Sequence, residues 1–173
     1  LLPRALNDLA LAAIVWREHA AAERWLAEAL AHVDGHDLDL WRLAILAARM
    51  RSLLDQGRWG AAADLARQLL DDERDSPGPR AEAHAVLALL RARRGDPGSS
   101  EAFAESARLQ SEPTWQIEVA TGRAEAAWLD GRHAAIAAVT DDAFALAGDR
   151  DAPWPYAGLA LWRHRAGLAV RVD

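Results

Sequence analysis

Apolar residues recur along this chain at the three- and four-residue spacing of α-helices. The segment 40–48 is apolar nearly all round, whereas the segment that follows Gly57 keeps its apolar residues on one side. An inner helix covered on two sides and an outer helix covered on one side would differ in this way. No segment shows the strict alternation that is typical of a β-strand. The pattern predicts helices at about 4–17, 20–33, 38–55, 59–73, 79–94, 98–109, 113–129, 133–147 and 153–166.

Glycine and proline separate these helix-length pieces. Glycine ends a helix because it adopts the left-handed conformation without steric cost, and a polar side chain before proline favours the start of the next helix. We expect the aspartate of Asp96–Pro97 and the serine of Ser111–Glu112–Pro113 to begin helices in this way. Because the connections are short, consecutive helices should lie antiparallel to one another.

The tight turns recur at a nearly constant spacing. Gly57, Gly95 and Gly131 lie 38 and 36 residues apart, and 38 residues before Gly57 the chain reaches His19 in the first short turn. A fixed period in this range predicts helical pairs stacked in a row. We therefore expect an all-α fold of about nine helices, a right-handed α–α superhelix of stacked antiparallel pairs. It would form a single domain, 1–173, with units at approximately 1–36, 37–76, 77–111, 112–150 and 151–173.

Composition narrows the possible functions. The sequence contains no cysteine and no lysine, so all 20 basic residues are arginine. Disulfides and thiolate metal sites are thereby excluded, and a Walker A loop would lack its lysine. The net charge is −6 and the arginines are interleaved with Asp and Glu, which argues against direct nucleic-acid binding. Since no nucleophile–base pair is visible, we expect no catalytic residue, no cofactor and no enzymatic activity.

Hydropathy and the start of the sequence bear on location. No stretch approaches the length of about 18 apolar residues that spans a membrane, and no signal peptide is recognisable. We therefore expect a cytoplasmic location without membrane contact. The sequence begins with Leu-Leu-Pro and its single methionine is Met50, so we expect it to be a segment of a longer protein.

Two charged clusters have alternative interpretations. The stretch 32–39 contains two histidines and three aspartates and could ligate a divalent ion. Gly35 as a helix end and Asp37 as an N-cap explain the same residues without a metal, and we therefore expect no metal site. The acidic run 71–75 is typical of a solvated helix end.

The turn at 57–62, Gly-Arg-Trp-Gly-Ala-Ala, resembles the Gly-x-Tyr/Trp-x-x-Ala turn of tetratricopeptide repeats, and 131–135 is a weaker copy. The segments 124–131, 151–154 and 158–167 are similar to the sensor arrays of large bacterial signalling ATPases of the maltose-regulator type. This resemblance implies a tetratricopeptide-like array with roles in signal transduction and transcription regulation. It also implies that the ATPase module and the LuxR-type DNA-binding domain lie outside this segment.

The first helix of each pair would line the concave side of such an array, where a peptide or another domain typically binds. The candidate groove residues are Ala44, Ala47, Arg51, Glu82, Ala85, Leu89, Glu118, Thr121 and Glu125. Trp154 and Trp162 lie eight residues apart on the last predicted helix and form a candidate terminal contact.

These observations predict a non-catalytic protein-interaction or regulatory scaffold. Its partner would be a protein, a peptide or another domain of the same longer chain. The alternative rests on the resemblance: a domain that senses a small-molecule inducer and controls an attached ATPase. Such a domain would need to bind the inducer more tightly in one conformation than in the other.

Overall fold

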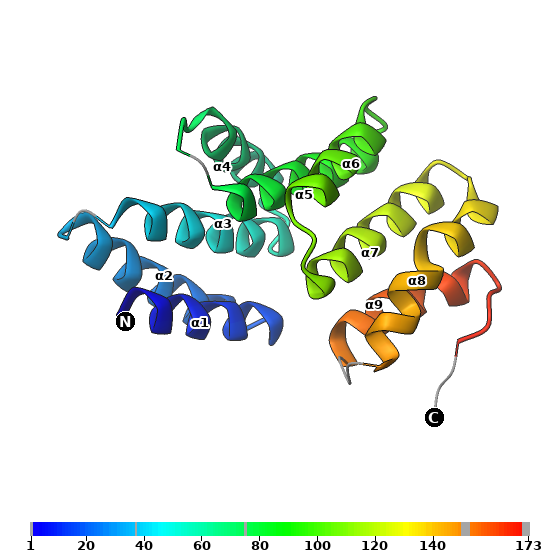
Figure 1. Ribbon diagram of the computed structural model, residues 1–173, viewed down its shortest axis with the longest axis horizontal. Coiled ribbons are helices and arrows are strands. Elements are labelled where there is room, and N and C mark those ends of the chain that lie inside the picture. Colours follow the sequence, from blue (N-terminus) through cyan, green and yellow to red (C-terminus); the bar gives the residue numbers. More distant parts are fainter. Residues whose placement is uncertain (1, 37, 75, 150–152, 171–173) are drawn as a thin grey trace. The chain divides into compact units, whose positions relative to one another are not determined.

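The computed structural model of the protein describes residues 2–36, 38–74, 76–149 and 153–170, and every regular element in these ranges is helical (Figure 1). The helices are α1 (Leu2–Val15), α2 (His19–Asp34), α3 (Asp39–Asp55), α4 (Trp59–Asp71), α5 (Pro77–Arg94), α6 (Ser99–Leu109), α7 (Pro113–Leu129), the 3₁₀ turn η1 (His133–Ala135), α8 (Ile136–Asp149) and α9 (Pro153–Arg165). The predicted all-α fold is confirmed over the described ranges. Predicted and observed helix ends agree within three residues.

Residues 1–86 and 87–173 form two compact units, and α5 contributes residues to both. In the first unit α1 packs on α2, α2 on α3 and α3 on α4, while α1 also contacts α3. In the second unit α7 packs on α6 and α8, and α9 packs on both α7 and α8. The first helix of one pair thus touches the first helix of the next, so that each unit is a stack of helical pairs.

One backbone turn ends the first helix of each pair. At Gly57 the φ angle is 74°, the amide of Gly57 donates to the Leu54 carbonyl at 3.1 Å, and the amide of Arg58 donates to the Leu53 carbonyl at 2.9 Å. These two hydrogen bonds define a Schellman motif, in which a left-handed residue ends the helix. The same pair of bonds and a positive φ recur at Arg17, Gly95, Gly131 and Gly167.

The first of these turns contains no glycine. Arg17 occupies the left-handed position with a φ of 60°, where a side chain costs about 1 kcal/mol. Its guanidinium lies 2.5 Å from the carboxylate of Asp55, at the end of α3. Consecutive turn residues now fall 40, 38, 36 and 36 residues apart. His19, the register mark expected from the sequence, lies two residues beyond Arg17 and is the first residue of α2.

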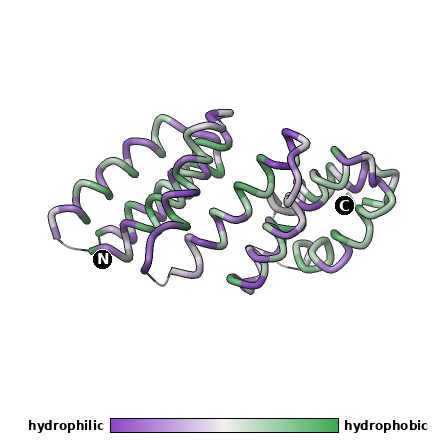
Figure 2. Tube along the Cα trace, turned by 90° about the horizontal axis from the view of Figure 1, so that it is seen from above, coloured by the Kyte–Doolittle hydropathy of each residue, from purple (hydrophilic) through white to green (hydrophobic). Residues whose placement is uncertain are grey.

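Small side chains and leucines fill the cores. In the first unit Leu6 and Ala10 of α1 pack with Leu26 of α2 and Ile45 of α3. Figure 2 shows hydrophobic and hydrophilic positions alternating along the helices within single turns, as the sequence periodicity predicts. The many alanines let helix backbones approach closely, so the leucines and isoleucines fill the space between layers.

Two predicted helix starts have different outcomes. The predicted start of α7 at Ser111–Glu112–Pro113 is confirmed, but the capping residue is Glu112 and not Ser111: the Glu112 side chain accepts a hydrogen bond from the Trp115 amide at 3.1 Å. The prediction that Asp96–Pro97 begins the preceding helix is wrong. Helix α6 begins at Ser99, after Gly98, which has a φ of 85°. A second left-handed residue therefore reorients the chain before α6 can start.

Arginine side chains hold the connection between α4 and α5. Arg74 donates to the Asp72 carboxylate through Nε at 2.8 Å and Nη2 at 2.6 Å, and it also lies 2.9 Å from Asp39 of α3. Arg80 of α5 donates to the Leu70 carbonyl of α4 at 2.9 Å. The side-chain bond from Arg74, together with its backbone amide, lowers the pKa of Asp72 from 3.8 to about 2.

Substituting two neighbouring glycines should have opposite effects on stability. Gly57→Ala should destabilise the protein by about 1 kcal/mol, because alanine is strained at a φ of 74°. Gly60→Ala, inside α4, should stabilise it by about 0.5–1 kcal/mol, because alanine favours helix and no atom lies within 4 Å of the added Cβ. Urea unfolding measures both free energies. Effects of the same sign would contradict the turn geometry.

The Asp72 carboxyl should titrate with a midpoint near pH 2 in the folded protein. Its bonds with Arg74 should persist while the carboxylate is ionised and disappear as the pH falls through this midpoint, because protonation removes the charge. In Arg74→Ala the midpoint should rise toward 3.8, the ordinary value for this group. Carbon-detected NMR of the carboxyl group measures both titrations. Arg67→Ala, an exposed arginine of α4, is the control and should leave the Asp72 midpoint unchanged.

Candidate functional site

The predicted groove residues of the first unit lie on α3 and α5. Ala44, Arg51, Glu82 and Ala85 are half-buried, and Ala47 is buried. Burial raises the pKa of Glu82, while the positive charge of Arg51 acts in the opposite direction. The structure thus brings Arg51 within electrostatic reach of Glu82.

The predicted groove residues of the second unit lie on α5 and α7 and are half-buried: Leu89, Glu118, Thr121 and Glu125. Glu125 accepts two hydrogen bonds from Arg93 of α5, at 2.6 and 3.3 Å. Thr121 packs against Gly158 of α9, in the next pair. A Cβ added to Gly158 would lie only 3.3 Å from the methyl carbon of Thr121. Glu125 and Thr121 therefore have structural partners within the unit. A partner-binding role for these residues stays a prediction.

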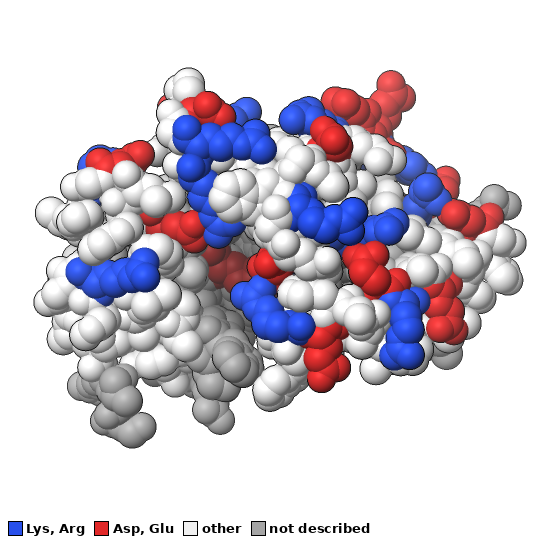
Figure 3. Space-filling view, turned by 180° about the vertical axis from the view of Figure 1, so that it is seen from behind, with Lys and Arg blue, Asp and Glu red and all other residues white. Residues whose placement is uncertain are grey.

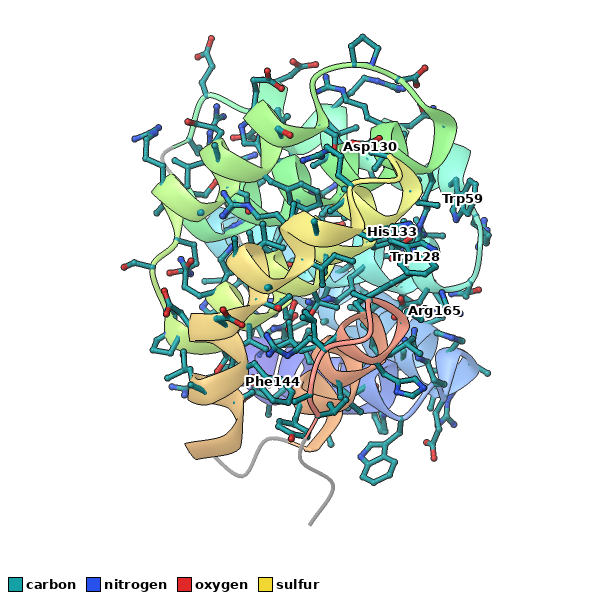
Figure 4. The ribbon with its side chains drawn as sticks, turned by 90° about the vertical axis from the view of Figure 1, so that its right-hand side faces the viewer. Trp59, Trp128, Asp130, His133, Phe144 and Arg165 are labelled. Atoms are coloured by element: carbon teal, nitrogen blue, oxygen red, sulfur yellow. The ribbon has the colours of Figure 1, made fainter. Side chains whose placement is uncertain are left out.

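The tryptophans of the last pair form part of an aromatic cluster. The rings of Trp162 and Trp128 lie 6.4 Å apart, and Trp128 stacks on His133 at 4.1 Å. The Arg165 guanidinium lies 4.9 Å from the ring of Trp162 and 6.0 Å from that of Trp128, and Figure 4 shows Trp128, His133 and Arg165 side by side. The protein's own cation thus occupies the ring faces. The side chain of Trp154 lies outside the described residues.

Arg163 fastens α9 to α8. Its side chain donates to Thr140 at 2.9 Å and to Asp141 at 2.5 Å, and its guanidinium lies 4.6 Å from the ring centre of Phe144. Phe144, labelled in Figure 4, also stacks on Tyr156 of α9 at 4.6 Å. This cation is engaged within the unit and is not available for a ligand.

The histidine-rich stretch between α2 and α3 has internal contacts. His36 hydrogen-bonds the His32 carbonyl at 2.7 Å, and the two rings stack at 4.2 Å. Asp37 lies outside the described residues. Over the ranges that the structure describes, no three metal-ligating side chains come together.

A groove of about 480 Å³ crosses α2, α3 and α4 within the first unit. Leucines from all three helices make it apolar: Leu30, Leu46, Leu53 and Leu65. Ala61 and a polar rim complete the lining, with the rim formed by Arg42, Arg49, Arg58, Asp64 and Gln68. We call this feature the α2–α4 groove. It combines apolar side chains with hydrogen-bond donors and a carboxylate, as binding sites for amphipathic ligands do.

The arginines of the α2–α4 groove differ in how their charges are compensated. Arg42 pairs with Asp34, and Arg49 lies 3.3 Å from Glu23, so both are paired with carboxylates of α2. The side chain of Arg58 is exposed and forms no hydrogen bond or ion pair with the described residues. One end of the groove therefore offers an uncompensated guanidinium, which can bind a carboxylate in a bidentate manner.

The rest of the charged surface is mixed. On the face shown in Figure 3, arginines and acidic side chains are interspersed among uncharged residues. Asp64, on the groove rim, follows this pattern because Arg67 lies 2.6 Å from it on the same helix. Charge alone therefore does not single out a binding surface on that face, and the α2–α4 groove stands out by its combination of leucines with Arg58.

This groove was not predicted from the sequence, because the candidate groove residues of α3, Ala44, Ala47 and Arg51, lie on another side of that helix and the second helices α2 and α4 were not considered. A signal was present: Arg42, Leu46, Arg49 and Leu53 follow the four- and three-residue spacing of one face of α3. A face that carries both arginines and leucines is typical of a helix that is covered by its neighbours only in part.

No helix among the described residues is long and apolar enough to cross a membrane. No family model, no curated protein and no solved structure matches this chain.

Proposed function

We propose that this chain is a non-catalytic interaction scaffold whose α2–α4 groove binds an amphipathic helical segment of a partner protein or of another domain. The observation that carries the proposal is the combination of four leucines and an uncompensated Arg58 in one groove. Helix-in-groove binding uses the same combination: apolar anchors fill the groove, and a charge at its edge fixes the register.

The geometry of the lining supports a helical occupant. The groove is lined along α3 by residues four and three apart, from Arg42 to Leu53, which lie along one side of that helix. A bound helix with leucines at similar spacing could insert its side chains between those of Leu46 and Leu53, since ridges of one helix pack into grooves of another.

The electrostatics support an acidic residue in the bound segment. Arg42 and Arg49 already have carboxylate partners on α2, so a partner gains little from them. Arg58 has none among the described residues, and a charge-assisted hydrogen bond to it would not have to displace an internal one. We therefore expect a glutamate or aspartate of the partner next to Arg58.

A small-molecule inducer is the second candidate. A volume of about 480 Å³ lies within the range of ligand pockets, roughly 300–1,000 Å³. An amphipathic carboxylic acid would use the same leucines and Arg58. The roles in signal transduction and transcription regulation that the sequence resemblance implies are compatible with either ligand and form part of this proposal.

A fluorescent helical peptide with leucines at heptad spacing and glutamates on its polar face should bind the protein, as measured by anisotropy. Arg58→Glu should weaken binding about tenfold or more, because it replaces an attraction with a repulsion. Arg4→Glu makes the same charge change at an exposed position of α1 outside the groove and should have little effect.

A sibling peptide with lysine in place of glutamate should bind more weakly to the wild type and more tightly to Arg58→Glu. Equal binding of both peptides, or an equal loss in Arg58→Glu and Arg4→Glu, would refute the proposed site. A thermal shift with dodecanoate but no binding of either peptide would favour the small-molecule candidate.

A further inference from the structure

Helix α1 carries a stripe of exposed apolar side chains. The stripe consists of Leu2, Ala5, Leu9, Ala12 and Trp16, spaced three and four residues apart. Leu2, Leu9 and Trp16 are 47%, 48% and 64% exposed. The packed face of the same helix is separate, with Leu6, Ala10 and Ile14 buried. Five apolar side chains on one exposed face are more than scattered surface residues, and such a patch marks an interaction site.

Helices α1 and α3 can be aligned on their left-handed turn residues, Arg17 and Gly57, so that each α1 residue corresponds to the α3 residue 40 positions later. The α3 residues equivalent to Leu2, Ala5 and Leu9 are Arg42, Ile45 and Arg49. All three contact the preceding pair: Arg42 and Arg49 bind carboxylates of α2, and Ile45 packs in the core with α1 and α2. The exposed stripe of α1 thus occupies the positions through which α3 packs on the pair before it.

Helix α9 gives an independent and closer comparison. When the two helices are aligned on their left-handed turn residues, Arg17 and Gly167, Pro3 matches Pro153 and residues 9–11 match residues 159–161. The four matched residues, one proline and a Leu-Ala-Leu run, are identical in the two helices. Leu159 is 0% exposed, because it packs against Ile117 and Ala120 of α7 and against Ala143 and Ala147 of α8. Leu9, its equivalent, is half exposed.

The same register holds further along the two helices. Trp162 and Ala166 pack in a second cluster with Ala124 and Ala127 of α7 and Ile136 of α8. Their equivalents in α1 are Ala12 and Trp16, which are both exposed. At each of these three positions the apolar residue of α9 is buried or partly buried, whereas the apolar residue of α1 is exposed.

We infer that the stripe on α1 is a docking surface for an antiparallel helix pair built like α7–α8. The occupant is a pair with alanines and isoleucines on its contact face, because α1 carries Leu2 and Leu9 where α3 carries arginines that bind acidic residues. The inference follows from continuity with the α7–α8–α9 interface. It concerns a surface other than the α2–α4 groove and is independent of the proposed function.

A chain extended by a copy of its own α7–α8 pair tests this docking. A copy of residues 112–150 is joined directly to residue 1, because residue 1 corresponds to residue 151 in the α9 register. The added pair should cover the stripe. Hydrogen exchange measured by mass spectrometry should then slow in the α1 peptides by about tenfold or more relative to the unextended chain, because burying Leu9 and Trp16 stabilises the helix against opening.

Leu9→Arg in the extended chain should abolish this added protection, because an arginine cannot be buried against alanines without a partner. Val15→Arg is the matched control: Val15 is 50% exposed on the same helix but lies outside the stripe, and the protection should remain. In the unextended chain both variants should leave exchange in α2–α4 unchanged, which shows that the first unit is still folded.

Unchanged exchange in α1 of the extended chain would overturn the inference, and so would equal protection in the Leu9→Arg and Val15→Arg variants. Sedimentation of the unextended wild type provides a further outcome. A dimer that Leu9→Arg converts to a monomer would assign the stripe to a second copy of the chain and would also overturn the inference.

Discussion

The left-handed turn at the end of each first helix is the constraint on which the rest of the structure depends. Its two backbone hydrogen bonds satisfy carbonyls that the helix end would otherwise leave unpaired, and they reverse the chain within three or four residues. Each second helix must therefore lie against the first. Because the turn recurs at Arg17, Gly57, Gly95, Gly131 and Gly167, positions in successive first helices can be matched by their distance from the turn. The register that relates α1 to α3 and to α9 is a direct consequence.

Local rules predicted most of the helices. Helix α7 was predicted with its observed ends, since proline after Glu112 and the Asp130–Gly131 pair are strong signals at its two ends. The end of α4 was placed two residues too late, because Asp72 leaves the helix to bind Arg74. The sequence contains no local sign that Arg17 is left-handed, since its ion pair with Asp55 depends on contacts that form only when the second pair stacks on the first.

The candidate site was less predictable than the fold. The sequence analysis identified residues of the first helices, and the structure engages several of them internally, as with Arg93 on Glu125 and Arg51 near Glu82. The α2–α4 groove combines residues of three helices, so its composition depends on how those helices pack and could not be derived from one helix at a time. Arg42 and Arg49 have carboxylate partners whereas the Arg58 side chain has none among the described residues, and this difference is likewise a property of the packed state.

Because helices contact only their own or adjacent pairs among the described residues, such a chain can change in a particular way over evolutionary time. Within each unit a helix touches its own partner and the adjacent pair, and the turns inside the pairs share one backbone geometry. An in-frame duplication or deletion of a single pair, a gene segment of about 40 codons, would thus keep the turn of every remaining pair and leave distant pairs undisturbed. Selection can adjust the length of the array separately from the chemistry of any one groove.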